Sequence, residues 1–199
     1  MNSSVSGSRL HSLQCASLVP VEKVHENPWF CVFNRGGYFT VENKQLQVIV
    51  LPIVENNSMV MVRVQRPVVS DDTLELPAGG AKMEETPVGA AQREFFEETG
   101  INIPDLGRFH LQPPLILTSR SPYLVHIFKL DLTRKEFDCR SGHDREILSV
   151  ECFSFSEVLN KIKRNEIYFG FQIAVLTRFL LQNEQIILAV DIKKDKLNA

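Results

Sequence analysis

The chain has 199 residues, of which 44% are hydrophobic and 23% charged, and its formal net charge is -2. This length and composition are typical of one globular domain and exclude a fibrous or largely disordered chain. The nearly neutral charge argues against a broad phosphate-binding surface, so we expect no nucleic acid as a partner. A local basic pocket for a small anionic substrate remains compatible with this balance.

The cysteines and the terminal segments indicate the compartment. The four cysteines, at positions 15, 31, 139 and 152, show neither CxxC spacing nor accompanying His pairs at zinc-like spacing. We therefore expect free thiols and a cytoplasmic protein. The first twenty residues have no continuous apolar core of signal-peptide length, and no apolar run approaches the ~20 residues that span a bilayer. The apolar stretch 186–190 indicates only a short strand or a helix end, so we expect no membrane association.

The elements are predicted in chain order. Residues 1–24, which mix Ser, Gly and Asn with scattered apolar residues, are expected to form an N-terminal arm, and 25–199 a single domain. Residues 28–40 surround Gly36 and Gly37 with aromatic and β-branched residues, which predicts a hairpin. The remaining predictions are a second hairpin of 46–54 and 58–64, a strand at 73–76, a loop at 77–80, a helix at 87–98, strands at 107–112, 115–118, 123–132 and 148–154, and helices at 156–164 and 171–182.

The predicted helix near residue 90 has clear signals at both ends. Thr86 can cap the free amides at its start, and Pro87 suits the first helical position. Gly100 can adopt the left-handed conformation that ends a helix. Inside the helix, the apolar residues Val88, Ala91 and Phe95 recur at helical spacing and are expected to face the core.

Another face of the same helix gathers carboxylates. Glu94 and Glu98 are four residues apart and share a face, and Glu97 lies on its flank. Arg93 can offset part of their repulsion by pairing with Glu97. The remaining oxygens suit a hard cation such as Mg²⁺ or Mn²⁺. Taken alone, such a run is more typical of a solvated acidic face than of a metal site.

The surrounding residues complete a longer motif. Residues 79–101 fit the pattern G-x5-E-x7-R-E-U-x-E-E-x-G-U, where U is a bulky aliphatic residue, and only Phe95 departs from it by being aromatic. This segment resembles the Nudix box. The stretches ENPWF at 26–30, VRVQRPVV at 62–69 and TLELPAGG at 73–80 extend the resemblance to the branch of ADP-ribose and nucleoside-diphosphate-sugar pyrophosphatases, over roughly residues 25–185.

The resemblance implies an α/β fold, an α/β/α sandwich with a mixed β-sheet and the box as loop–helix–loop. It also implies a metal site for Mg²⁺, with Mn²⁺ as the alternative. Its expected ligands are the side chains of Glu94 and Glu98, the backbone carbonyl of Ala78, and Glu97 as a ligand or as the residue that orients metal-bound water. Arg93 is expected to hold the carboxylates, Glu85 to fix the loop, and Gly79 to contact the substrate.

In the ADP-ribose hydrolases of this branch, the general base is a glutamate on a loop outside the box. The matching stretch here is HDREI at 143–147, so Glu146 is the candidate base and Asp144 its assistant or alternative. Both can equally be ordinary loop charges, and a lone loop residue such as His143 is more often exposed than catalytic. Arg66 corresponds to the family's Q-x-R-like element and can clamp a phosphate, or be an exposed Arg at a strand end.

Substrate choice is less well indicated. Trp29 can stack on a base, although core or dimer packing is the simpler interpretation. Many ADP-ribose hydrolases carry a Ser-Pro-Gly-like loop followed by Glu-Arg, whereas this chain has TSRSPYL at 118–124. GDP-mannose and other sugar nucleotides therefore remain contenders beside ADP-ribose, with Arg120 or Tyr123 reading the sugar or base.

The expected function is metal-dependent hydrolysis of a nucleoside diphosphate sugar into two monophosphates. The alternatives are a Nudix hydrolase of nucleoside triphosphates or dinucleoside polyphosphates, and a catalytically silent domain that senses a nucleotide sugar. The box retains the four glutamates that its pattern specifies, Glu85, Glu94, Glu97 and Glu98, which argues against a catalytically silent domain. Members of the branch usually dimerise through their N-terminal strands, so the resemblance also implies a homodimer.

Overall fold

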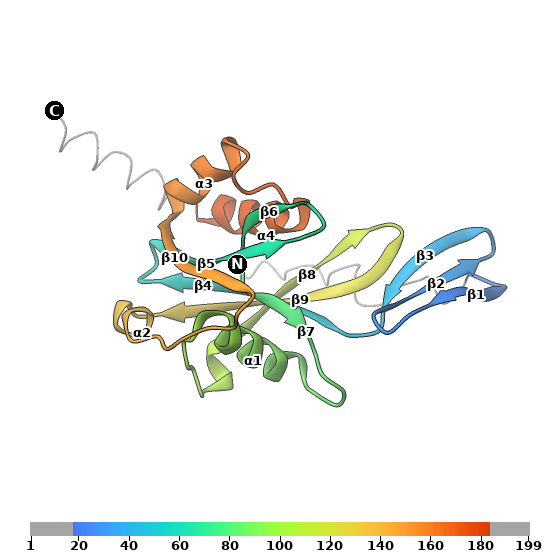
Figure 1. Cartoon of the computed structure of the whole chain (residues 1–199), viewed down its shortest axis with the longest axis horizontal. Coiled ribbons are helices and arrows are strands. Elements are labelled where there is room, and N and C mark those ends of the chain that lie inside the picture. Colours follow the sequence, from blue (N-terminus) through green and yellow to red (C-terminus); the bar gives the residue numbers. More distant parts are fainter. Residues whose placement is uncertain (1–17, 184–199) are drawn as a thin grey trace, which may run out of the picture.

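The computed structural model describes residues 18–183, and its centre is a mixed β-sheet with helices on both faces (Figure 1). The strand order along the sheet is β10-β5-β4-β9-β8, with β6 paired to β5 and β7 paired to β4. Strands β4 and β9 run parallel, and the other pairs are antiparallel. The bounds are β4 (Gln47–Val54), β5 (Ser58–Arg66), β6 (Asp71–Glu75), β7 (Ala78–Gly80), β8 (Phe109–Thr118), β9 (Ser121–Leu132) and β10 (Ile147–Ser154).

Alternation along the strands produces two separate cores. On β4, Val48 and Val50 face the core that includes Ala91 and Phe95 of α1 (Pro87–Thr99). Ile49 and its neighbours at every second position face the other core, which contains residues of α3 (Phe155–Lys163) and α4 (Gly170–Gln182). Nearly every residue of β4 is buried because both faces of this strand are covered. The structure is thus the predicted α/β/α sandwich.

The turns have the expected chemistry. Residues 55–57 connect β4 to β5, and Glu55 and Asn56 adopt positive φ values of 48° and 56° as in a primed turn, which the amide of Asn57 closes by donating to the carbonyl of Val54. Gly36 and Gly37, with φ values of 60° and 93°, form a two-residue connection from β2 (Phe30–Arg35) to β3 (Tyr38–Asn43). Both predicted hairpins are present.

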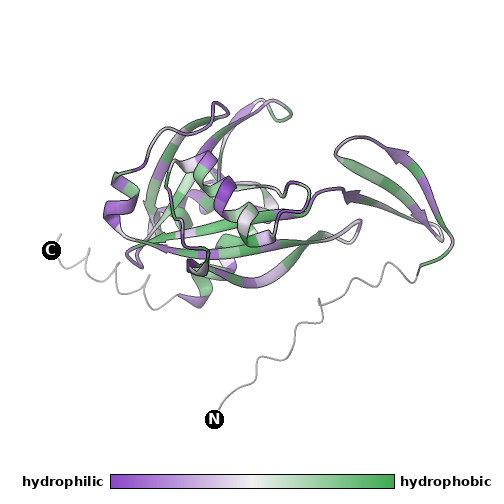
Figure 2. Cartoon of the chain, turned by 90° about the horizontal axis from the view of Figure 1, so that it is seen from below, coloured by the Kyte–Doolittle hydropathy of each residue, from purple (hydrophilic) through white to green (hydrophobic). Residues whose placement is uncertain are grey.

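A second, three-stranded sheet projects from the sandwich in the order β1-β2-β3 (Figure 2). Its first strand, β1 (Val21–Glu26), begins inside the range predicted as an N-terminal arm, because residues 21–26 pair with β2. Residues 1–17, which make up most of that arm and include Cys15, lie outside the described part of the chain. The apolar stretch 186–190 lies outside it as well.

A few short elements were not predicted. The helix α2 (Arg134–Asp138) is fixed by a capping box between Thr133 and Glu136, and a 3₁₀ turn, η2, covers Leu106–Arg108. Strand β7 occupies part of the predicted loop 77–80. Cys31, Cys139 and Cys152 are free thiols. Among residues 18–183, no helix is long and apolar enough to cross a membrane.

Candidate active site

The helix α1 carries the chemistry, and its ends form as predicted. Thr86 Oγ1 accepts a hydrogen bond of 3.1 Å from the amide of Gly89, and Pro87 opens the helix. Gly100, at φ 69°, closes it by donating its amide to the carbonyl of Phe96 at 2.8 Å. Ala91 and Phe95 are fully buried, so α1 is anchored to the sheet by one face and presents its carboxylates from another.

Two of these carboxylates lie against β7. The carboxyl group of Glu94 occupies the space that a Cβ atom at position 79 would need, so any side chain there would displace this carboxylate. Glu98 Oε2 accepts a hydrogen bond of 3.0 Å from the amide of Ala78. The close approach of β7 to α1 therefore orients both carboxylates.

Arg93 connects the start of the helix to its acidic face. Its Nε and Nη2 atoms bind the Glu85 carboxylate at 2.9 and 2.8 Å, and Nη2 also donates to the carbonyl of Gly80 at 2.9 Å. Its Nη1 atom donates to Glu94 and Glu97 at 2.8 Å each, so the predicted pair with Glu97 is confirmed. The hydrogen bonds from Arg93 lower the pKa of Glu85 to about 2, so this carboxylate is ionised, and the same bonds connect the loop before α1 to the helix.

Glu94 and Glu98 are compensated only in part. Burial raises the pKa of Glu98 to about 8, and the hydrogen bond from Ala78 offsets only part of this effect. Burial also raises the pKa of Glu94, which the nearby charges of Glu97 and Glu85 raise further against the opposing effect of Arg93. These two groups form a desolvated acidic pair that an added positive charge would stabilise in its ionised form.

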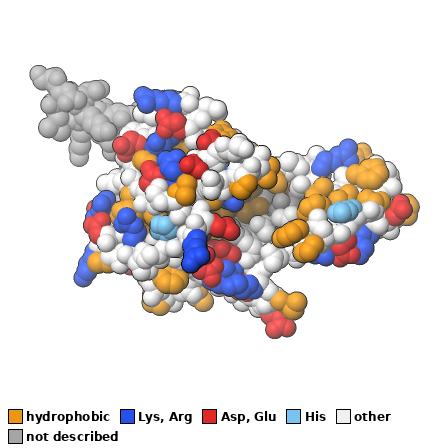
Figure 3. Space-filling view, in the orientation of Figure 1, with side chains coloured by type: hydrophobic (Ala, Val, Ile, Leu, Met, Phe, Trp, Pro, Cys, Tyr) orange, Lys and Arg blue, Asp and Glu red, His pale blue; other side chains and the backbone are white. Residues whose placement is uncertain are grey.

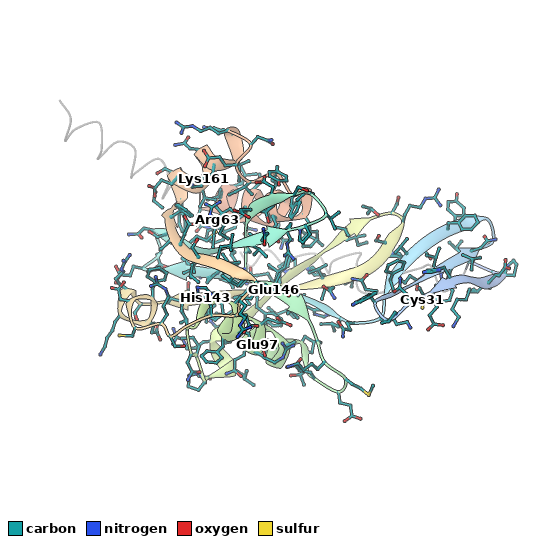
Figure 4. All side chains as sticks on the ribbon, viewed as in Figure 1. Cys31, Arg63, Glu97, His143, Glu146 and Lys161 are labelled. Carbon is teal, nitrogen blue, oxygen red and sulfur yellow. The ribbon has the colours of Figure 1, made fainter. Side chains whose placement is uncertain are left out.

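A distant loop is held against the C-terminal end of α1. The amide of Asp144 donates to the carbonyl of Glu97, and the amide of Ser141 to that of Gly100, both at 2.9 Å. The last carbonyls of a helix lack intrahelical partners, so this loop supplies the hydrogen bonds that they need. It also brings Glu146 to the region of Glu97, as Figure 4 shows.

These elements enclose one polar pocket of about 280 Å³. Carboxylates from α1 and from the 141–146 loop face it together with a guanidinium from β5 and the backbone of β7. Its lining residues are Val64, Arg66, Ala78, Gly79, Gly80, Glu94, Glu98, Asp144, Glu146 and Ile147.

The residues that line this pocket lie within a segment that matches a known family model. The model of the NUDIX domain matches residues 43–171, which is more than half of the chain. The chain belongs to the Nudix family. No curated protein sequence matches it significantly.

Solved structures share the Nudix fold with this chain. One, described as an ADP compounds hydrolase, has a TM-score of 0.60 at 17% sequence identity and covers 83% of this chain and 94% of its own. Another, a NUDIX hydrolase from Nitrosomonas europaea, has a TM-score of 0.54 at 19% identity, with coverage of 69% and 89%. The predicted fold and the prediction of a Nudix hydrolase are confirmed.

Nudix hydrolases generally use divalent metal ions. Within residues 18–183, no three His, Cys, Asp or Glu side chains converge in a geometry that holds a metal ion. Arg93 instead occupies oxygens of Glu94 and Glu97. The donor set nevertheless fits a hard cation, because its oxygens are carboxylate and carbonyl atoms and Glu94 and Glu98 are partly buried with too little positive charge nearby.

The predicted substrate-binding residues separate into two groups. Arg66 and Gly79 line the pocket beside the Nudix box, whereas Trp29 and Arg120 do not. Trp29 is 71% exposed and precedes β2, which rules out core packing. Arg120 lies over the ring of Tyr38 on the projecting sheet, at 5.5 Å from its centroid. The side chain of Tyr123 lies outside the described part of the chain.

One neighbour of the pocket was missed. Arg66 is bound through two hydrogen bonds, of 2.8 and 3.0 Å, by Glu75, which the sequence analysis did not single out. The available signal was alternation: Thr73 and Glu75 are two residues apart, on one face of a strand that precedes the box. His143 contacts only the carbonyl of Asp144 among the described hydrogen bonds.

Proposed function

We propose that this Nudix hydrolase cleaves the diphosphate of a nucleoside diphosphate sugar, of the ADP-ribose or GDP-mannose type, into two monophosphates. One observation carries the proposal: Glu94 and Glu98 of the box share a pocket with Glu146, Asp144 and Arg66. Residues far apart in sequence thus supply the metal-binding, basic and phosphate-binding groups that such a reaction requires.

Mg²⁺ is the proposed cofactor, with Mn²⁺ as the alternative. The ligands would be the carboxylates of Glu94, Glu98 and Glu97 and the backbone carbonyl of Ala78. When bound, the ion neutralises the diphosphate and lowers the pKa of the attacking water. Arg93 would then serve as the group that keeps Glu94 and Glu97 in place through its hydrogen bonds.

Glu146 is the proposed general base, and Asp144 its assistant or alternative. Glu146 takes one proton from the water as the oxygen attacks a phosphorus atom. The bond between that phosphorus and the bridging oxygen breaks, and the bridging oxygen leaves with the other phosphate. Arg66 lines the same pocket and pairs with a phosphate during this displacement.

The substrate class rests on sequence and fold together. The stretches at 62–69 and 73–80 resemble the sugar-nucleotide branch, and the fold is shared with a protein described as an ADP compounds hydrolase. ADP-ribose is therefore the first substrate to test, and GDP-mannose the second.

The deciding experiment measures phosphate release, with a coupled phosphatase, from ADP-ribose, GDP-mannose, UDP-glucose, diadenosine polyphosphates and nucleoside triphosphates. Each is assayed with Mg²⁺, with Mn²⁺ and with EDTA. We expect metal-dependent turnover of a sugar nucleotide that Glu146→Gln slows and that Glu22→Gln, an exposed carboxylate on β1, leaves unchanged. Turnover of triphosphates or dinucleotides alone would favour another Nudix class, and no turnover at all would favour a silent sensor.

We also propose that the chain is a homodimer formed through the projecting sheet. Large apolar side chains are exposed there and gather on one lobe in Figure 3, and contiguous apolar patches often mark interaction sites. The residues concerned are Val21 (47% exposed), Val24 (45%), Trp29 (71%), Tyr38 (59%), Phe39 (52%) and Val41 (39%). A second copy of the same sheet would cover them, and light scattering after size exclusion measures the resulting mass.

A further inference from the structure

Arg66 lines the active-site pocket, and one nitrogen of its guanidinium makes no hydrogen bond within the described part of the chain. Its Nε and Nη2 atoms are bound by the carboxylate of Glu75 at 2.8 and 3.0 Å. Within residues 18–183, Nη1 has no hydrogen-bonding partner. The pKa of Arg66 is raised first by the bond to Glu75 and also by the charges of Glu98 and Glu146, so the guanidinium lies within the field of the acidic pocket.

Glu75 itself is placed to hold Arg66 and not to touch a substrate. Its residue exposure is 5%, and it is not among the residues that line the pocket of Glu94 and Glu98. Its Oε1 atom also accepts a hydrogen bond of 2.5 Å from the hydroxyl of Thr73. A buried carboxylate needs such partners, and here Arg66 and Thr73 supply them.

The register of the sheet explains why these groups meet. Strand β6 pairs antiparallel with β5, with Thr73 opposite Val64 and Glu75 opposite Val62. Thr73 and Glu75 therefore share a face with Arg66, which lies two residues beyond Val64. Arg66 extends along the strand pair over Thr73 to reach Glu75, and this path fixes the plane of its guanidinium.

A comparable triad on the same strand provides a contrast. Arg63 Nε binds Glu151 Oε1 at 2.9 Å, and Ser149 donates its hydroxyl to the same oxygen at 2.8 Å. Arg63 lies on the opposite face of β5 by alternation, and neither Arg63 nor Glu151 lines the active-site pocket. The two triads share their chemistry but not their position, so only the Arg66 triad has access to a substrate in that pocket.

We propose that Glu75, supported by Thr73, is a positioning residue for substrate binding: it fixes Arg66 through Nε and Nη2 so that Nη1 meets a phosphate of the substrate diphosphate. The identity of the substrate in this role rests on the proposed function, whereas the contacts between Glu75 and Arg66 do not depend on it. Two of the three donor nitrogens are committed to the protein, so the third is presented without loss of side-chain freedom on binding.

The test compares Glu75→Gln, Arg66→Gln and the double variant. The substituted amide cannot accept both hydrogen bonds from Arg66, so the guanidinium loses its fixed orientation. With ADP-ribose and Mg²⁺, we expect each single variant to raise KM about tenfold, with a much smaller change in kcat. The double variant should match Arg66→Gln, because Glu75 acts only through Arg66. Thr73→Val should give a smaller change in the same direction.

Glu151→Gln is the matched control, since it breaks the equivalent triad on the other face of β5. It should leave KM at the wild-type value, while thermal melting reports any loss of stability in every variant. The proposal is overturned by a wild-type KM in Glu75→Gln, by an equal rise in Glu151→Gln, or by a double variant much worse than Arg66→Gln.

A second readout separates this inference from the proposed function. Calorimetry measures binding of inorganic pyrophosphate in the presence of Mg²⁺. If the wild-type protein binds pyrophosphate but hydrolyses no sugar nucleotide, the proposed function fails. Weaker binding in Glu75→Gln, with wild-type binding in Glu151→Gln, then still supports the positioning role. Equal binding by all three proteins contradicts it.

Discussion

The sandwich and the projecting sheet differ in where their apolar and charged side chains lie. In the sandwich, apolar side chains fill two cores, the partly buried Glu98 lines a polar pocket, and the buried Glu75 holds Arg66 beside it. In the β1-β2-β3 sheet, every residue of β1 is exposed, and large apolar residues such as Trp29 face solvent. Buried charge is costly without partners and exposed apolar surface is unfavourable, so each region is suited to a binding event. The sandwich is suited to bind a metal cation and an anionic substrate, and the projecting sheet is suited to bind an apolar protein surface.

The largest expected effect comes from removing a charged group from the polar pocket of the sandwich. Glu98→Gln removes a negative charge that the proposed metal site requires, so kcat/KM with Mg²⁺ should fall about a thousandfold. The oligomeric mass should stay at its wild-type value, because Glu98 lies in the sandwich. Steady-state kinetics and light scattering measure the two properties, and near-wild-type activity would remove Glu98 from the metal site.

A second prediction concerns the joint between α1 and the loop of Glu146. Gly100 has φ 69°, and a Cβ atom there would overlap the carbonyl of Ser141. We expect Gly100→Ala to lower the free energy of unfolding by about 2 kcal/mol and to reduce activity by displacing that loop. Gly142→Ala is the control on the same loop, since its Cβ would meet nothing within 4 Å. Urea denaturation measures the stability of the two variants, and steady-state kinetics measures their activity. Equal losses of stability in Gly100→Ala and Gly142→Ala would show that the overlap at Gly100 is unimportant.

A third prediction concerns the exposed apolar residues of the projecting sheet. Trp29→Ser, alone or with Val24→Ser, should shift the protein from dimer to monomer by removing exposed apolar area. The melting temperature of the sandwich should change little, because Trp29 makes no contribution to either core. Leu148→Ser, an exposed apolar residue on β10 at 47%, is the matched control in the sandwich. A dimer that survives in the double variant would place the interface elsewhere.

The smallest expected effect concerns a partly exposed ion pair in the sandwich. Hydrogen bonds from Arg108 lower the pKa of Glu136 from 4.5 to about 2. A carboxylate with a lowered folded-state pKa stabilises the fold above its unfolded pKa and loses that contribution as the pH falls towards 2. Glu136→Gln should therefore cost about 0.5 kcal/mol at pH 7, and the difference from wild type should shrink below pH 4.5. Melting curves between pH 7 and pH 3 test this, and a constant difference would contradict it.

The sequence by itself determined the local features of this protein. Helix geometry places Glu94 and Glu98 on one face whatever surrounds them, and Thr86, Pro87 and Gly100 define the helix ends. Most strands were predictable for the same reason, since alternation and turn residues act over a few positions. The short elements α2 and β7 were not predicted from the sequence. The helix α2 is stabilised by a capping box, and β7 is stabilised by pairing with β4.

The contacts between distant segments were decided by the tertiary structure alone. Glu146 reaches the pocket because its loop satisfies the last carbonyls of α1, and Glu75 holds Arg66 because of the register between β5 and β6. Trp29 and Arg120 were predicted to bind the substrate, and in the structure neither lines the pocket of Glu94 and Glu98, while Arg120 lies over Tyr38 of β3. Spacing along the chain fixes neighbours within a helix or a strand. Which strand pairs with which, and in what register, depends on the packing of the whole sandwich.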